Sequence, residues 1–341
     1  MMLLLRRALS MGTTVLVLAS GANLASVRHV SAVENVGKCQ AVALEVALFR
    51  DATEVLFSVA ERRRALDPKA PWVPHRYFVK NADEAHRIAF EGPIPIVGMS
   101  LDDLIDCSRS SNPNAGQLVT FAGVHRGFLQ LMAAPKIKSV ADLKGKRVAI
   151  DTDTGYASAL FEILRRQSHE RDRGDFKVIY AGATNLRYDK LLRGEFDATL
   201  LGAPFTRLAL RQGYNSLGTV IGALGGYQAV VFVARRPWLA EHQEIARAVA
   251  SCLSETLKWA SLPENRARVE AYVAEIVGGL DGPAASQVTE DLFGPASEFL
   301  PDGRMHDGDT RVVIDLFNAS RGTALTQETV TKLTDYVATT P

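Results

Sequence analysis

Short apolar runs alternate with amphipathic stretches through most of the chain. In the segment 139–204, one predicted strand ends at Asp151, a second begins at Phe176 and a third ends just before Pro204. Apolar residues of the segment 156–166 recur at the spacing of one helix face. Strands that alternate with helices in this way predict parallel sheets joined by right-handed crossovers.

The first part of the chain repeats this plan. Strands are predicted at 41–49, 77–79 and 94–100, with helices at 53–65 and 82–90 between them. These two parts of the chain are therefore each expected to form one lobe of the molecule, with a mostly parallel sheet flanked by helices.

The last third of the sequence is predicted to be mostly helical. Helical patterns cover 240–262, 265–277 and 326–338. The stretch 278–309 is rich in Gly, Pro and Asp, so it is interpreted as a loop with short helices.

Small polar residues follow the strand that ends at Asp151, and a helix is expected to start near Tyr156. The backbone N–H groups of residues 154–157 should then lie at a helix N-terminus. Such an end binds anions without a formal positive charge.

The segment 1–32 differs from the rest of the chain. An arginine pair at 6–7 precedes an apolar run at 8–20 that is too short to span a bilayer stably. This order is typical of a secretory signal, with cleavage expected after Ala32 or, as the alternative, after Ala25. The other interpretation is a cytosolic protein with an apolar N-terminal helix.

Length, composition and charge fit two lobes that bind a small molecule. The chain has 341 residues, which is too long for one ordinary compact core. Its 23% of charged residues and net charge of +1 indicate neither a disordered chain nor a general nucleic-acid electrostatic footprint.

Three scattered cysteines predict neither a zinc site nor a disulfide framework. A disulfide between Cys39 and Cys107 is one interpretation, and buried thiols at these positions and at Cys252 are the other. Lys38 directly before Cys39 argues against a lipoprotein signal. Cys107 with His125 lacks a third orienting group for nucleophilic catalysis.

Several motifs of enzymes are missing from the sequence. It holds no His-Glu-x-x-His helix, no Walker loop and no Gly-x-Ser-x-Gly elbow. We therefore expect no catalytic residue, no metal and no cofactor.

Four motifs, in this order, carry a resemblance to a known family. They are "SVADLKGKRVAID", "GATNLRYDKLLRGEFDATLLGAP", the Gly213-Tyr214 step before "LGTVIG", and "YQAVVFVARRPWL". With them, residues 118–260 resemble the periplasmic solute-binding proteins of ABC importers. The similar branch includes sulfonate, taurine and nitrate binders and the NMT1/THI5-like thiamine-precursor binders.

The resemblance implies the two-lobed type 2 periplasmic binding protein fold, an α/β fold with a ligand cleft between its lobes. Lobe 1 is expected to comprise 33–124 and 229–341, and lobe 2 to comprise 125–228. The segments 119–132 and 227–235 would be the two hinge crossings, and the C-terminal helices would pack on lobe 1.

Candidate ligand-binding residues follow from this fold, because ligands of open parallel sheets bind beyond the carboxyl ends of the strands. The small polar residues after "VAID" are implied to hold the ligand's head group. Each candidate also has an ordinary structural interpretation, as a helix cap or a surface ion-pair partner. The candidates are Arg50, Asp51, Thr53, Ser100, Thr152, Asp153, Thr154, Gly155, Tyr156, Asn185, Arg187 and Pro204, with Phe49 and Thr184 beside them.

The sign of the ligand's charge stays open in the sequence. A sulfonate or carboxylate would be repelled by Asp51 and Asp153 unless Arg50 or Arg187 offsets them, whereas a cationic or neutral heterocycle would be favoured by these carboxylates. The expected helix N-terminus shifts the prediction towards an organic anion.

Three functions remain as hypotheses. The first is a monomeric periplasmic receptor that closes on a small organic solute and delivers it to an inner-membrane ABC permease. The second is a solute sensor or accessory protein for a membrane signalling receptor. The third is a THI5-like pyrimidine precursor enzyme, although the cysteine-rich segment of those enzymes has no counterpart here.

Overall fold

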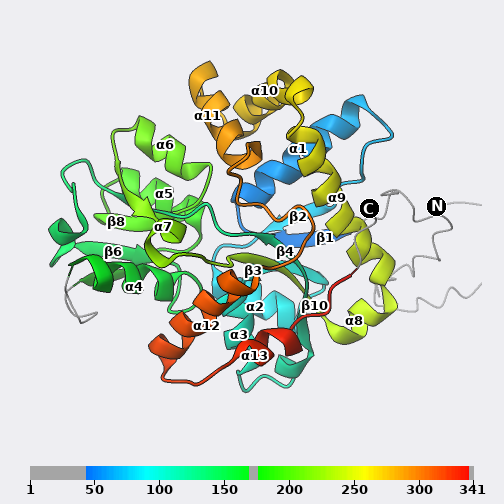
Figure 1. The fold of residues 1–341 in the computed structure, drawn as a ribbon, viewed down its shortest axis with the longest axis horizontal. Coiled ribbons are helices and arrows are strands. Elements are labelled where there is room, and N and C mark those ends of the chain that lie inside the picture. Colours follow the sequence, from blue (N-terminus) through cyan, green and yellow to red (C-terminus); the bar gives the residue numbers. More distant parts are fainter. Residues whose placement is uncertain (1–43, 169–175, 338–341) are drawn as a thin grey trace, which may run out of the picture. The chain divides into compact units, whose positions relative to one another are not determined.

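The computed structural model describes residues 44–168 and 176–337 (Figure 1). The description below concerns these residues, which belong to the unit 36–341. The predicted signal segment, its cleavage site and Cys39 lie outside the described residues. Among the helices of the described ranges, none is long and apolar enough to cross a membrane.

The first sheet has five strands in the order β2-β1-β3-β10-β4. Strand β10 is antiparallel to both of its neighbours, whereas β1 is parallel to β2 and β3, so β10 alone in this sheet opposes the common direction. The strands are β1 (Glu45–Leu48), β2 (His75–Phe78), β3 (Ile96–Ser100), β4 (Leu118–His125) and β10 (Val230–Arg235).

The second sheet repeats this arrangement in the order β7-β6-β8-β5-β9. Strand β5 is antiparallel to β8 and β9, and β6 is parallel to β7 and β8. Two mixed, mostly parallel sheets confirm the predicted fold class. The strands are β5 (Gln130–Ala133), β6 (Arg147–Ile150), β7 (Lys177–Tyr180), β8 (Ala198–Leu201) and β9 (Asn215–Thr219).

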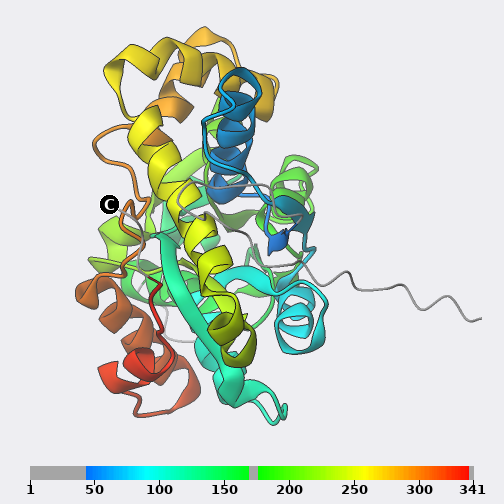
Figure 2. The same cartoon turned by 90° about the vertical axis from the view of Figure 1, so that its right-hand side faces the viewer.

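Helices flank both sheets. Figure 1 shows α5 and α6 on one side of β6 and β8, with α4 on the other. Figure 2 shows the long helix α9, in yellow, crossing the view beside the strand β4. The helices are α1 (Ala52–Leu66), α2 (Ala82–Glu91), α3 (Leu101–Ser108), α4 (Ala157–Ser168), α5 (Thr184–Leu192), α6 (Phe205–Arg211), α7 (Val220–Leu224), α8 (Arg236–Glu241), α9 (Gln243–Ala260), α10 (Arg266–Val277), α11 (Gly282–Phe293), α12 (Asp307–Arg321) and α13 (Gln327–Lys332).

Polar caps start the helices that follow the strands of the first sheet. Asp51 accepts a hydrogen bond from the N–H of Thr53 at 2.8 Å, and Asn81 accepts one from the N–H of Glu84 at 2.9 Å. Ser100 caps α3 through the N–H of Asp103 at 3.2 Å. Each cap satisfies an orphan amide of the first helical turn, so these polar residues gather where the strands end.

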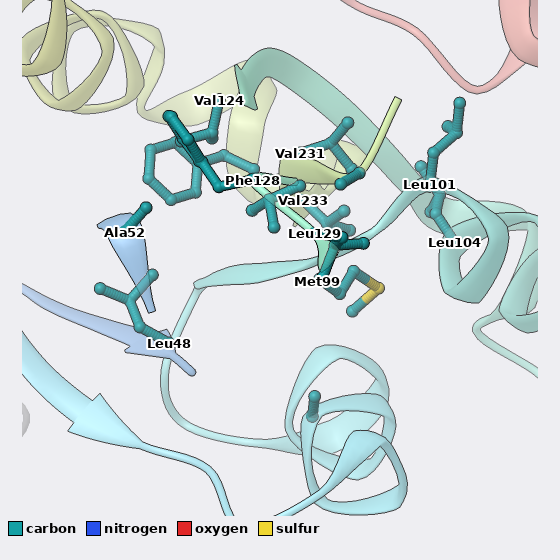
Figure 3. Close-up of a cluster of buried hydrophobic side chains, with 14 of the residues drawn as sticks. Leu48, Ala52, Met99, Leu101, Leu104, Val124, Phe128, Leu129, Val231 and Val233 are labelled. Carbon is teal, nitrogen blue, oxygen red and sulfur yellow. The ribbon is translucent and has the colours of Figure 1, made fainter. Parts of the chain in front are cut away.

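The core of the first sheet is apolar and aromatic. The ring of Phe232 on β10 lies 6.2 Å from that of Phe57 and 6.0 Å from that of Phe121, and all three side chains are fully buried. Figure 3 shows further side chains of this core, among them Met99 and Val231. Truncating one such aromatic ring to alanine costs about 3–5 kcal/mol, so this core fixes the frame that carries the strand ends.

The first crossing between the sheets is not one extended segment. The chain leaves the first sheet at the end of β4 and enters the second at β5, and between them Gly127 and Phe128 have φ angles of 122° and 54°. These left-handed residues turn the chain, and a periodic apolar pattern carries no signal for them. The chain returns between β9 and β10.

The segment 278–309, expected to be a loop with short helices, contains the 12-residue helix α11 and the start of α12. Asp281 caps α11 through the N–H of Ala284 at 3.0 Å, and a proline occupies its first turn. Asp281 and the proline after it are thus the helix-start signals within this Gly-, Pro- and Asp-rich segment.

The C-terminal helices contact elements of both sheets. Helices α9 and α10 pack on α1, as expected for the first lobe. Helix α11 instead reaches α6, where Arg207 and Asp291 form a bidentate ion pair with contacts of 2.5 and 2.7 Å. The lobe boundaries at 124, 125, 228 and 229 stay a prediction.

Candidate functional site

A pocket lies where the carboxyl ends of the strands from both sheets meet. It encloses about 530 Å³ of empty space, including its open mouth. Its lining comes from the segments that follow β1, β2, β3, β6, β7 and β8, together with the crossing between β4 and β5. The lining residues are Phe49, Asp51, Ala82, Ser100, Asp103, Gly127, Leu129, Asp151, Thr152, Thr154, Gly155, Tyr156, Thr184, Arg187 and Gly202.

The wall from the first sheet is built on the capped start of α3. The hydroxyl of Ser100 donates a hydrogen bond of 2.6 Å to Asp103 Oδ2. His86 of α2 lies on the other side of this carboxyl group, with Nε2 3.2 Å from Asp103 Oδ1. Asp103 is only 4% exposed, so its carboxyl group is held in a fixed direction at the pocket wall.

Asp103 and His86 form a buried ion pair. Burial lowers the pKa of His86, but the hydrogen bonds with Asp103 and Cys107 outweigh this and raise the pKa to about 11. For Asp103, burial acts in the opposite direction and raises the pKa, but the contacts with His86 and Ser100 outweigh it and lower the pKa below its ordinary value. At neutral pH the pair is therefore a carboxylate and an imidazolium.

Asp102 lies beside this pair and joins the two sheets. Its Oδ2 accepts hydrogen bonds from the hydroxyl of Tyr227 at 3.1 Å and from Ser158 of α4 at 3.4 Å. Burial, reinforced by the charge of Asp103, raises the pKa of Asp102 to about 6. The side chain is thus a polar contact between α3 and α4 next to the pocket.

The wall from the second sheet is the turn between β6 and α4. The hydroxyls of Thr152 and Thr154 are 2.8 Å apart and hydrogen bond to each other. Gly155 has a φ of 60°, and a Cβ there would lie 3.1 Å from Asp103 Oδ2. Glycine suits this position, because the φ is left-handed and a side chain would require the Asp103 carboxyl group to shift. The helix itself begins one residue after Tyr156, later than the sequence predicts.

Tyr156 and Arg187 complete this wall. Burial and then the charges of nearby carboxylates, Asp51 first, raise the pKa of Tyr156 well above its ordinary value, so its hydroxyl stays a donor. The terminal nitrogens of Arg187 donate to the carbonyls of Gly182 and of Leu200, the latter at 3.2 Å, and its Nε has no hydrogen-bond partner in the described structure.

Asp151 is a further carboxyl group of the lining. Burial raises its pKa to about 6, Arg187 opposes this, and the charges of Asp103 and Asp83 add to it. Its Oδ1 is buried without a hydrogen-bond partner among the described residues. A carboxylate in this position favours a neighbour that supplies a proton or a positive charge.

The structure brings seven of the twelve predicted ligand-binding residues to the pocket: Asp51, Ser100, Thr152, Thr154, Gly155, Tyr156 and Arg187. Phe49 and Thr184, nominated beside them, also line it.

Five predicted residues lie outside the lining. The guanidinium of Arg50 is over the ring of Phe78 at 3.9 Å. Asp153 is exposed and accepts a hydrogen bond from Tyr180 at 2.7 Å. Thr53 is buried in the first turn of α1, Asn185 is partly buried in the first turn of α5, and Pro204 precedes α6 after a cis peptide bond.

The sequence analysis missed several lining residues, among them Asp103 and Asp151. A signal for Asp103 was present, because a Ser-x-x-Asp pattern at the end of a strand is typical of a helix cap. Asp151 is the last residue of "VAID" and lies at a strand end. His86, the partner behind Asp103, has no signal in the sequence, since a lone histidine on a helix is ordinary.

The cysteines of the described residues are thiols. Cys107 is a free, buried thiol, and Cys252 is also buried. No group of three or more His, Cys, Asp or Glu side chains in the described part of the chain is placed to hold a metal ion.

Comparisons with known proteins agree with this architecture. Residues 117–265 match the family model described as NMT1/THI5 like. The search of curated proteins gave no match. The resemblance predicted from the four motifs is therefore confirmed by the family model over this range.

Solved structures share the fold over most of the chain. The periplasmic aliphatic sulphonate binding protein SsuA from Escherichia coli is 17% identical with a TM-score of 0.62, covering 89% of this chain and 94% of that one. The periplasmic nitrate-binding protein NrtA from Synechocystis is 12% identical with a TM-score of 0.64, covering 87% of each chain.

A third similar structure is the ligand binding component of an ABC-type import system from Staphylococcus aureus. It is 11% identical, has a TM-score of 0.67, and covers 86% of this chain and 96% of that one. The fold of this protein is thus that of the two-lobed periplasmic binding proteins.

Proposed function

We propose that the protein is the substrate-binding receptor of an ABC importer, which captures a small organic solute by hinge closure. The observation that carries this proposal is the pocket at the joined strand ends, lined from both sheets. Ligands of such folds bind at this edge, where loops from separate strands converge.

Contacts across the pocket support closure. Ser158 and Tyr227 both reach Asp102, and the N–H of Ala183 donates to the carbonyl of Lys80 at 2.9 Å. Such contacts form only when the two walls are together, so a solute held between them favours the closed population. The left-handed residues at 127 and 128 mark a place where the chain can change direction between the sheets.

The setting follows from the same proposal. The predicted signal segment would export the chain to the periplasm as a monomer, where it delivers its solute to an inner-membrane permease. The similar proteins of Escherichia coli and Synechocystis are described as periplasmic. No reacting group or cofactor is part of this function.

A ligand screen tests the proposal. The chain from Val33 onward is purified and heated with sulfonates, carboxylates, nitrate-like anions, amines, amidines and pyrimidines. A solute that binds the folded pocket raises the Tm in a saturable way. Small-angle scattering with that solute should show a smaller radius of gyration than without it.

The other hypotheses give different results in the same screen. A well-folded protein that responds to no solute would contradict the receptor and favour the sensor or accessory role. Chemical change of a bound pyrimidine, followed by mass spectrometry, would favour the enzyme.

A further inference from the structure

The surroundings of the pocket are more acidic than basic. Asp51, Asp103 and Asp151 line it, and Asp102 lies just behind Asp103. The cation among the described lining residues is Arg187. His86 pairs with Asp103 at 3.2 Å, and His125 approaches Asp51 at 3.6 Å. Even with both histidines charged, four carboxylates face three cations, so one negative charge is left for a solute to offset.

An anionic solute would find few donors here. The terminal nitrogens of Arg187 already donate to the carbonyls of Gly182 and Leu200, so Nε is the nitrogen of this guanidinium that has no partner among the described residues. The turn before α4, where an anion was expected, lies against the carboxylate of Asp103, 3.1 Å from the Cβ position of Gly155. A sulfonate or carboxylate placed there would meet a like charge in a poorly solvated site.

The surroundings favour an organic cation over a metal ion. The described residues hold no group of three His, Cys, Asp or Glu side chains placed to hold a metal. Phe49, Leu129 and Tyr156 supply apolar and aromatic surface to the same pocket. Aromatic faces attract organic cations, and carboxylates accept strong hydrogen bonds from N–H groups of an amine or amidine.

We infer that the pocket takes a small organic solute with one positive charge on nitrogen, an amine, amidine or guanidine, held by Asp51, Asp103 and Asp151. This inference rests on the proposed receptor function and names its substrate class. It replaces the organic anion expected from the sequence, because the predicted helix N-terminus is occupied by a carboxylate from the opposite wall.

A matched charge series tests the inference. Benzamidine, benzamide, benzoate and benzenesulfonate share one ring, and butylamine, butanol, butyrate and butanesulfonate share one chain. Binding is measured by calorimetry at pH 7.5 in 0.15 M NaCl, together with every solute found in the broader screen. In a series that binds, the cation should bind at least about tenfold more tightly than its neutral partner, and the anions should not bind.

Isosteric variants locate the charge. Asp51→Asn and Asp151→Asn should each weaken the cation about tenfold, because the amide keeps the shape and removes the charge. Asparagine also keeps the helix cap at residue 51. Asp189→Asn, on the exposed face of α5, is the matched control and should change the affinity by less than about twofold.

The outcomes separate the two proposals. The inference of a cationic solute would be wrong if an anion or a neutral partner bound more tightly, or if Asp189→Asn lost as much affinity as the pocket variants. The proposed receptor function would still hold in both cases. Absence of binding by every solute of any charge would overturn the receptor itself and the cation with it.

Discussion

Carboxyl groups at strand ends are the feature that distinguishes this molecule at the scale of single residues. Asp103 is compensated by His86 and Ser100. Asp151 is half-buried and is favoured by the charge of Arg187, but its buried Oδ1 has no hydrogen-bond partner among the described residues. A buried carboxylate in such surroundings lowers stability when it ionises. Asp151 lies in the pocket wall although its charge lowers the stability of the fold. This supports the proposed role of Asp151 in binding.

The variant Asp151→Asn should make this cost visible. The folded pKa of about 6 lies above the ordinary 3.8, so the native state binds more protons than the unfolded state between these values. Stability then falls as the pH rises through this window, and the penalty is complete above about 6. We expect the variant to be more stable than the parent by about 1–2 kcal/mol at pH 7.5, with little difference at pH 4. Denaturant unfolding at both pH values measures this, and an equal effect at the two values would contradict it.

At the scale of elements, caps decide where helices begin and thereby where the site lies. Asp51 and Ser100 cap α1 and α3 at the ends of β1 and β3, and both line the pocket. The same chemistry starts α11 at Asp281, outside the pocket lining, in a segment that was expected to be a loop with short helices. A capping residue is thus a signal for a helix, and its neighbouring Gly and Pro do not cancel it.

The cap of α11 can be tested with two substitutions at one position. Asp281→Ala removes the acceptor for the N–H of Ala284 and should lower the free energy of unfolding by about 1 kcal/mol. Asp281→Asn keeps the acceptor and loses the exposed ion pair with Arg211, which contributes little, so it should retain most of the stability. Urea unfolding compares them. Equal losses would show that the ion pair, and not the cap, stabilises this helix.

At the scale of the whole molecule, the two sheets meet through polar contacts and a glycine. Tyr227 and Ser158 donate hydrogen bonds to Asp102, and a Cβ at Gly155 would lie only 3.1 Å from Asp103 Oδ2. A methyl group added to the turn before α4 would therefore increase the distance between the two walls. The proposed hinge closure depends on this close approach.

Gly155→Ala tests this contact, with Gly145→Ala as its control. Both glycines have a left-handed φ, 60° and 70°, so both variants carry a similar backbone strain of about 1 kcal/mol. Only at residue 155 does the new methyl group meet the opposite wall, because residue 145 has open space around it. The first variant should have the larger radius of gyration in scattering and the weaker solute binding. Identical behaviour of the two variants would remove the contact from the mechanism.

The sequence by itself determined the local features of this protein. Its periodicity predicted helices at 53–65 and 82–90, which are α1 (Ala52–Leu66) and α2 (Ala82–Glu91) almost to the residue, and the order of strands and helices predicted the α/β class. Periodicity and caps act between residues near in sequence, so a single chain reveals them. Seven of the twelve ligand-binding candidates reached the pocket because strand ends converge in any fold of this class.

Only the tertiary structure decided the electrostatics of the site. Asp103 and Gly155 are far apart in sequence and come together across the two walls, and His86 arrives from a third element. Asp153 lies in sequence between the lining residues Thr152 and Thr154, but it is exposed and accepts a hydrogen bond from Tyr180. The charge that surrounds a solute depends on such long-range packing and on burial, and neither is encoded in the spacing of residues along the chain.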